Sequence, residues 1–326
     1  MLYKKVSKNE YEELIELMNT AFNMQGHQKF EKLLPKLYFK DNEDMIHSGA
    51  YEDGKLVASI GLYKMTMVSK YSTLNVGCIG AVSTHPNYRL KGYFKELMKR
   101  TIKEAKKQKC DLLFLGGNRL RYGRFGFENA GRKFVFNISS RTKHRLKPKE
   151  FEVIKLDKDD ERSIDACLSL YNKSSQKMLR TNENFYNHII SWNCVPYVVK
   201  VDNEIIGYYG LKDDSFIYEF IYKKGYKDTV LAACLSDKKE VSIQTSMNEL
   251  TKDILHKIDW YKVEHNEMFN VLNWDNVAKY LNFKEGYKED FKKLSKKERI
   301  IIGLGSEISE SKYGYESIFT FPCDQG

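Results

Sequence analysis

The stretch HPNYRLKGYFKELM, residues 85–98, connects a predicted strand to a predicted helix and is rich in basic residues. The apolar run before it, Val76 to Val82, is typical of a strand, and the residues after Gly92 place apolar side chains at helical spacing. Glycine at such a junction allows close approach to the backbone, and the free N–H groups of a helix start bind anions. The stretch therefore predicts a cradle for a phosphate-bearing cofactor. A helix start that is merely basic is the simpler interpretation.

The sequence on both sides of this stretch indicates an α/β fold. DLLFL, residues 111–115, has the composition of a short buried strand, which gives strand, loop, helix and strand in the βαβ order of a parallel pair. A hairpin with its turn at Asp53–Gly54 comes before, and Ser7 with Glu10 fits a capping box at an opening helix. The fold class that we predict is α/β (α+β), with a mixed, strongly twisted sheet flanked by helices.

The second half of the chain contains a weak copy of the first. EDGKLVASIGL, residues 52–62, aligns without gaps on VDNEIIGYYGL, residues 201–211, and a helical segment precedes both. We therefore predict two tandem copies of one fold, the second degenerate, with domains at 1–145 and 146–265 and a short C-terminal segment at 266–326. In that segment, DNVAKYL predicts a helix capped by Asp275, and SKKE, residues 295–298, predicts a capping box.

Composition limits the classes of protein to consider. Of the 326 residues, 42% are hydrophobic and 30% are charged, which is typical of a globular chain. The sequence has no run of eighteen apolar residues and no signal-peptide pattern. The six scattered cysteines predict free thiols in a reducing cytoplasm, without a zinc site or disulfides. The net charge of +10 would attract nucleic acid, an anionic membrane or a phosphate-rich small molecule, yet the lysines are dispersed as on a solvated surface.

Two motifs in the first 135 or so residues resemble a known family. The hexapeptide RLKGYF, residues 89–94, is similar to the R/Q-x-x-G-x-G/A signature of the GCN5-related N-acetyltransferase (GNAT) superfamily, with Phe94 in place of a small residue. Tyr122, four residues before Gly126–Phe127, matches the family's second mark. The tandem arrangement further resembles the mycobacterial enhanced-intracellular-survival (Eis-like) acetyltransferases. Residues 266–326 would correspond at best to a remnant of their sterol-carrier-like third domain.

The resemblance implies two tandem GNAT-like domains and an acetyl-CoA-dependent N-acetyltransferase, in which a primary amine attacks the thioester directly in a ternary complex. It implies no metal. In addition, Arg119 and Arg121 are expected to attract the anionic cofactor. The cofactor-binding residues implied by the resemblance are Val82, Ser83, Thr84, Arg89, Leu90, Lys91, Gly92, Tyr93, Phe94, Lys95, Gly117 and Asn118.

Two catalytic residues follow from the same resemblance. Tyr122 would be the general acid that protonates the departing CoA thiolate, for which a phenol of pKa about 10 is well matched; a packed aromatic residue is the alternative interpretation. The general base would be the terminal carboxylate, here that of Gly326, with a chain of water molecules as the alternative. His85 precedes a proline, where a structural role is more common.

The resemblance leaves the acceptor open as a small-molecule or peptide amine. The second domain has no counterpart of the signature beyond KKGYKD, residues 223–228, so we expect it to bind no CoA and to line the acceptor pocket. We expect a cytoplasmic protein with no membrane or nucleic-acid partner, and a homo-oligomer stays open because the resembled group includes hexamers. Two other functions stay open, an aminoacyl-tRNA-dependent transferase and a non-catalytic acyl-CoA sensor.

Overall fold

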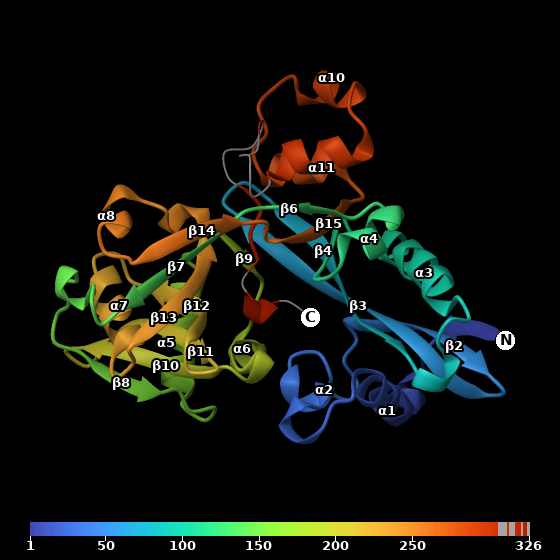
Figure 1. Ribbon diagram of the computed structural model, residues 1–326, viewed down its shortest axis with the longest axis horizontal. Coiled ribbons are helices and arrows are strands. Elements are labelled where there is room, and N and C mark those ends of the chain that lie inside the picture. The colour runs from blue at the N-terminus through green and yellow to red at the C-terminus, as the bar shows by residue number, and fades with distance from the viewer. Residues whose placement is uncertain (306–311, 313–316, 321, 325–326) are drawn as a thin grey trace.

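The computed structural model describes residues 1–305, 312, 317–320 and 322–324, and these form two mixed β-sheets flanked by helices (Figure 1). The first sheet has eight strands in the described chain. Seven follow one path, in the order β1 (Leu2–Lys5), β2 (Met45–Glu52), β3 (Lys55–Ser69), β4 (Thr73–Thr84), β5 (Leu112–Leu115), β15 (Glu267–Val271) and β6 (Glu128–Ala130). The remaining strand, β9 (Gln176–Met178), pairs with β3 off this path.

The second sheet repeats this plan with seven described strands. In the corresponding direction their order is β8 (Glu152–Lys155), β10 (Val195–Val201), β11 (Glu204–Lys212), β12 (Phe216–Tyr222), β13 (Glu240–Ser246), β7 (Lys133–Ser139) and β14 (Trp260–Glu264). In each sheet the fourth and fifth strands are parallel and every other pair along the path is antiparallel. The predicted α/β class with two tandem copies is confirmed.

The hairpins that carry the sequence repeat are equivalent in the two sheets. Strand β2 ends at Glu52 and β3 begins at Lys55, while β10 ends at Val201 and β11 begins at Glu204, as the gapless alignment requires. Both two-residue turns lie in the left-handed region, with φ of 51° and 78° at Asp53–Gly54 and 50° and 64° at Asp202–Asn203. Such turns match the twist of an antiparallel pair.

Strands are exchanged between the two sheets, in addition to the pairing of β9 with β3. Strand β7 follows β6 along the chain, yet it pairs with β13 and β14, and β15 returns to pair with β5 and β6. Each exchanged strand lies between two strands of the other sheet and forms hydrogen bonds with both. Separation of the repeats would therefore leave the backbone N–H and C=O groups of those strands without partners. The domain limits at 145 and 265 stay a prediction, because β7 before the first limit and β15 after the second pair with strands on the far side of those limits.

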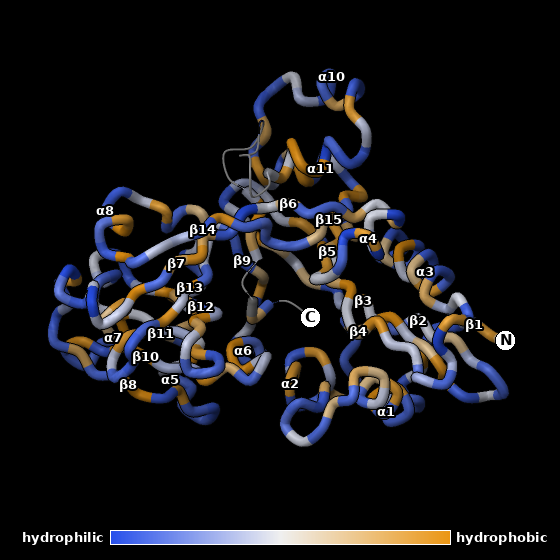
Figure 2. The backbone as a smooth tube through the Cα atoms, viewed as in Figure 1, coloured by the Kyte–Doolittle hydropathy of each residue, from blue (hydrophilic) through white to orange (hydrophobic). Residues whose placement is uncertain are grey.

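Helices cover both faces of each sheet (Figure 1). On the first sheet, α3 (Tyr93–Lys107) packs on one face and α1 (Tyr11–Phe22) and α2 (Phe30–Leu33) pack on the other. On the second, α7 (Lys227–Leu235) covers one face and α5 (Glu161–Tyr171) and α6 (Asn182–Ile189) cover the other. The apolar residues follow the strands and the inner faces of the helices (Figure 2). The shorter helices are α4 (Arg119–Tyr122) and α8 (Lys252–Leu255).

The C-terminal segment contains α9 (Trp274–Tyr280), α10 (Tyr287–Lys292) and α11 (Lys296–Leu304). The capping box predicted at Ser295 and Glu298 is confirmed at the start of α11. The predicted cap of α9 is wrong by two residues, because Asn273 caps this helix and accepts a hydrogen bond from the Asn276 N–H. Asp275 instead forms an exposed ion pair with Lys288 at 2.7 Å.

A buried ion cluster joins the end of the described chain to the second repeat. Arg180 donates to both carboxylate oxygens of Glu219 at 2.7 and 2.8 Å and to Asp324 at 2.8 and 3.0 Å, and all three side chains are fully buried. His188 lies 3.2 Å from Asp324, and Lys36 donates to the Cys323 carbonyl. The six cysteines are buried and none forms a disulfide, which confirms the predicted free thiols.

Candidate functional site

Strands β4 and β5 diverge and leave a gap in the middle of the first sheet. They pair only at Val76–Leu112, Gly77–Leu113 and Cys78–Phe114. Past Cys78, no strand of the described chain pairs with this edge of β4. A register shift in the β3–β4 pairing and a φ of 45° at Ala81 mark a bulge in this part of β4. The N–H and C=O groups of residues 79–84 that do not pair with β3 are therefore available to a ligand between the strands.

The loop between β4 and α3 presents unpaired backbone donors. Leu90 and Gly92 have φ of 68° and 83°, and the Leu90 side chain is fully exposed. A Cβ at Gly92 would meet nothing within 4 Å, so the glycine is required by its backbone conformation and not by packing. Within the described chain, the N–H groups of residues 90–94 have no acceptor. These N–H groups lie at the start of a fifteen-residue helix and face solvent. Free N–H groups at a helix start bind anions.

A cavity of about 510 Å³ lies against this loop and the end of β4. Val82 and Thr84 line it, while Ser83 between them is buried on the other face and donates from Oγ to the Ala81 carbonyl at 2.8 Å. Strand alternation explains this difference. Of the residues predicted to bind the cofactor, the cavity is lined by Val82, Thr84, Arg89, Leu90, Lys91, Gly92, Tyr93 and Phe94. It is not lined by Ser83, Lys95, Gly117 or Asn118.

Several side chains of the loop form hydrogen bonds to other parts of the first repeat. Arg89 donates to the Ala21 carbonyl at the end of α1 at 3.0 Å. Lys91 donates to Glu52 at 2.7 Å, and the buried Tyr93 hydroxyl donates to the same carboxylate. These bonds dock the loop on α1 and on the β2–β3 hairpin, and they leave the backbone amides to face the cavity. His85 accepts the Asn87 N–H at 3.3 Å, which is the structural role expected for it.

Gly117 and Asn118 both support Tyr122. The Tyr122 ring lies so close to Gly117 that a Cβ there would come within 2.4 Å of Cε2. The Asn118 side chain caps α4 by accepting the Leu120 N–H at 2.8 Å, and its carbonyl accepts the Tyr122 N–H at 3.1 Å. These two residues were predicted to contact the cofactor, and in the structure their contacts position the tyrosine.

Tyr122 is buried in an aromatic cluster on the α3 side of the sheet. Its ring lies edge-on to Phe94, with centroids 5.7 Å apart, and Phe94 also contacts Phe125 at 5.5 Å. Phe94 stands where the family signature has a small residue, and its ring packs against the aromatic cluster. Burial raises the pKa of the Tyr122 hydroxyl, and the neighbouring Arg121 guanidinium partly opposes this. The phenol is therefore protonated at neutral pH.

The two arginines expected to attract the cofactor differ in their contacts. Arg119 forms a two-pronged ion pair with the buried Glu128 carboxylate, with one N···O distance of 2.9 Å, so its charge is already balanced within the protein. The expectation for Arg119 is not supported by this contact. Arg121 lines the cavity and lies 5.0 Å above the Phe94 ring. Its charge therefore faces the same space as the loop amides.

Glu267 on the exchanged strand β15 was not singled out from the sequence. Its side chain is 9% exposed, and its Oε2 lies 3.4 Å from the position of a Cβ on Gly116, the residue that follows β5. Within the described chain its carboxyl forms no hydrogen bond or ion pair. Burial raises the pKa of Glu267 to about 7, against a weaker effect of Lys133. Only its place next to apolar residues in the stretch EMFNV could have drawn attention to it.

Glu267 and Tyr122 lie on opposite faces of the sheet beside adjacent glycines. Tyr122 belongs to the core on the α3 side, together with Met268. Glu267 precedes Met268 and shares a face with Phe269, which packs in the core on the α1 side. Gly116 and Gly117 therefore separate a buried carboxyl from a buried phenol at the end of β5.

The predicted base at Gly326 lies outside the described residues. The nearest described acidic residue, Asp324, is committed to the buried ion cluster. Burial opposes its charge, yet Arg180 and His188 hold the pKa of Asp324 well below its usual range. Burial lowers the pKa of His188 to about 4 despite its contact with Asp324. The described residues contain no group of acidic, histidine and cysteine side chains suited to a metal ion.

Comparison with known proteins identifies the first repeat. Residues 2–130 match the family model described as an acetyltransferase (GNAT) domain. This part of the chain is a GNAT domain. The family assignment confirms the predicted enzyme class, an N-acyltransferase, and the match includes β4, the loop and Tyr122. No curated protein matches the chain.

Solved structures extend the likeness to both repeats at the level of the fold. A probable N-acyltransferase from Enterococcus faecalis V583 matches with a TM-score of 0.67 and 17% identity, over 86% of this chain and 74% of its own. Eis1 from Mycobacterium abscessus matches with a TM-score of 0.60 and 12% identity, over 85% and 75%. A GCN5-related N-acetyltransferase from Kribbella flavida matches with a TM-score of 0.62 and 13% identity, over 85% of this chain and 73% of its own. The tandem fold that the sequence resembled is confirmed.

None of the helices in the described part of this chain has the length and apolar character needed to cross a bilayer. The longest described helix is α3, with fifteen residues.

Proposed function

We propose that the chain is an acetyl-CoA-dependent N-acetyltransferase that acetylates a primary amine. The observation that carries the proposal is the combination of a gap between two parallel strands with unpaired amides at residues 90–94. A diphosphate needs several close donors at low desolvation cost, and a helix start with left-handed residues supplies them. The GNAT assignment of residues 2–130 supports this use of the site.

The cofactor would lie along the open edge of β4. Its diphosphate would accept hydrogen bonds from the amides of residues 90–94, and Arg121 would add positive charge to the same cavity. The pantetheine arm would pair with the free backbone groups of residues 79–84, as a strand would. Placed this way, the thioester would point toward the end of β5, where Tyr122 packs against Gly117 and Glu267 lies beside Gly116.

Tyr122 would act as the general acid. An amine attacks the thioester carbonyl, the tetrahedral intermediate collapses with loss of the CoA thiolate, and the Tyr122 hydroxyl donates its proton to that sulfur. The phenol is held in position by Gly117, Asn118 and Phe94, and burial keeps it protonated at neutral pH. Such proton transfer contributes about 10²- to 10⁴-fold to a rate.

A proton acceptor is also needed, because an alkylammonium of pKa about 10.4 cannot attack until it loses a proton. Glu267 is one candidate, since it is buried on the face opposite Tyr122 and its pKa of about 7 suits a base at neutral pH. The terminal carboxylate of Gly326 and a chain of water molecules are the others. The acceptor is proposed to be a small-molecule or peptide amine, with the second repeat lining its pocket.

Thiol release from acetyl-CoA in the presence of a broad panel of amines tests the proposal. We expect at least one amine to support turnover, and Tyr122→Phe to lower kcat by about 100-fold while the Kd for CoA stays unchanged. Calorimetry that detects no binding of acetyl-CoA at high micromolar concentrations would exclude the function. Binding without turnover for any amine would favour the acyl-CoA sensor instead.

The proton acceptor is identified by two further variants. Glu267→Gln removes the buried carboxyl with little change in shape, and deletion of Gly326 moves the terminal carboxylate by one residue. If Glu267 is the base, only the first variant loses the rise of kcat/KM around pH 7. If the terminal carboxylate serves, only the deletion lowers turnover, and if neither variant responds, a water chain is favoured.

A further inference from the structure

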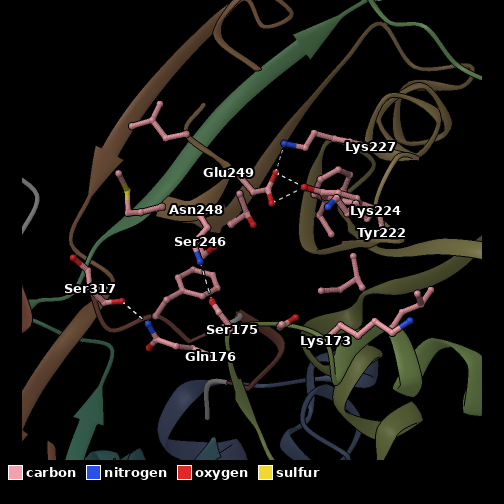
Figure 3. Close-up of a pocket in the computed structure, with 18 of the residues that line it drawn as sticks. Lys173, Ser175, Gln176, Tyr222, Lys224, Lys227, Ser246, Asn248, Glu249 and Ser317 are labelled. Carbon is pink, nitrogen blue, oxygen red and sulfur yellow. Dashed lines mark hydrogen bonds and ion pairs between the residues drawn. The ribbon is translucent and has the colours of Figure 1, made fainter. Parts of the chain in front are cut away.

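The second repeat contains a cavity of about 730 Å³ at the position that corresponds to the cofactor cleft of the first (Figure 3). Strands β12 and β13 are parallel and pair only at Phe216–Ser242 and Ile217–Ile243, and then diverge as β4 and β5 do. The cavity lies beyond the divergence, between the end of β12 and the residues that follow β13. Its volume is that of a site for a small molecule.

An acidic side chain lies beside the helix start in this repeat. The Glu249 carboxylate accepts from the Tyr222 hydroxyl at 2.7 and 2.8 Å and pairs at 2.9 Å with Lys227, the first residue of α7. The connection before α7 spans only residues 223–226, against residues 85–92 before α3. Glu249 thus stands where a diphosphate would approach. A ligand of this cavity must bind in another way than CoA is proposed to bind in the first repeat.

The remaining lining is polar and carries unbalanced positive charge. Lys173 and Lys224 are exposed, and neither forms an ion pair with a described residue. Across the cavity from Tyr222 and Glu249 lie Ser175 and Gln176 (Figure 3). Their side chains are ordered by neighbours, because Asn248 donates to Ser175 at 2.9 Å and Gln176 donates to the Ser317 carbonyl at 2.9 Å.

The lining also includes three aromatic side chains, of which Tyr222 is partly exposed and Phe220 and Phe319 are buried at the edge of the core. Phe220 and Tyr222 lie side by side, with centroids 5.2 Å apart, and Phe319 from the C-terminal segment lines the same space. Ammonium groups at the rim favour an anion, hydroxyl and amide groups favour a ligand with several hydroxyls, and aromatic faces favour the apolar side of a sugar ring. We infer that this cavity is a second binding site, specific for a phosphorylated sugar.

Ribose 5-phosphate is the probe that tests this site, and ribose is its uncharged control. The full chain is labelled for amide NMR and saturated with CoA, so that the first cleft is filled. We expect saturable shifts at Ser175, Lys224 and Asn248 with ribose 5-phosphate, and none with ribose. Shifts confined to residues 88–94, or no saturable shift in the millimolar range, would overturn the inference.

Matched charge variants show whether the two lysines recognise the phosphate. Lys173→Gln with Lys224→Gln should raise the Kd about tenfold, because two charge-assisted contacts are lost. Lys103→Gln with Lys158→Gln removes the same charge at exposed positions elsewhere and should leave the Kd unchanged. Equal effects of both pairs would reduce the binding to non-specific attraction. Turnover is not measured, so the result is independent of the proposed acetyl transfer.

Discussion

The Tyr122 ring occupies the space that a side chain at Gly117 would need, with Cε2 only 2.4 Å from the position of a Cβ. Gly117 does not have a left-handed conformation, so its backbone does not require glycine. Glycine is needed at this position because the Tyr122 ring leaves no space for a side chain. The glycine and the tyrosine therefore belong to one unit, in which the backbone after β5 sets the position of the phenol.

Gly117→Ala is expected to displace Tyr122. The methyl group should lower the free energy of unfolding by about 1–3 kcal/mol and kcat by about 10- to 100-fold, because the ring must move. Gly123→Ala is the matched control, since a Cβ at Gly123 meets nothing within 4 Å and its conformation is helical. Chemical denaturation and thiol release measure the two effects. An unchanged kcat in the Gly117 variant would contradict the role of Gly117 in positioning Tyr122 for catalysis.

Gly92→Ala is expected to impair cofactor binding. Its φ of 83° would be strained in alanine, which should cost about 1 kcal/mol of stability. A loop that relaxes would also misplace its amides, so we expect the Kd for CoA to rise about tenfold. Gly286 caps α10 with a φ of 87° and also has free space around it. Gly286→Ala should therefore lose similar stability with an unchanged Kd, as titration calorimetry would show.

Glu267→Gln is expected to change stability with pH. The pKa of Glu267 is raised from 4.5 to about 7 by burial, so ionisation destabilises the fold as the pH rises through this range. At pH 8 the variant should be more stable than the parent by about 3 kcal/mol, and near pH 4 the difference should vanish.

Glu264 is a control of opposite sign. The ion pair with Lys262 holds the pKa of Glu264 below its usual value against the effect of burial. Its contribution to stability is present above the unfolded pKa and is lost as the pH falls, so Glu264→Gln should not stabilise the protein at pH 8. Urea titrations across this pH range test both variants. A constant difference for Glu267→Gln at all pH values would contradict a raised pKa.

Asp324→Asn is expected to destabilise the protein strongly. Asp324 and Glu219 together balance the buried Arg180 and Lys36, so removal of one carboxylate leaves unbalanced buried positive charge and should cost about 3–5 kcal/mol. The pKa of Asp324 is held well below its usual value, so its stabilisation is present at neutral pH and is lost as the pH falls below about 4. Asp214→Asn, at a side chain that is 93% exposed, should have little effect on the urea midpoint. Equal midpoints for both variants would refute the anchoring role.

Local features could be predicted because they depend on residues that are close in the chain. The hairpin turns require left-handed residues, and Asp53–Gly54 and Asp202–Asn203 supply them at both copies. The helix start at Gly92 and the capping box at Ser295 follow from the same kind of local chemistry. The α9 cap was placed two residues too late, because Asn273 and Asp275 are both suitable caps and helix ends are weakly specified.

The sequence by itself determined the repeated hairpin and the basic loop before α3, since each rests on backbone preferences over a few residues. Only the tertiary structure decided that β7 and β15 exchange sheets, and that this exchange brings Glu267 beside Gly116. The hydrogen-bonding groups of a strand are the same whatever its side chains, so its partner is chosen by packing across the whole fold. The pairing of Arg180 with Asp324 has the same origin, because burial joined two charges that are far apart in the chain.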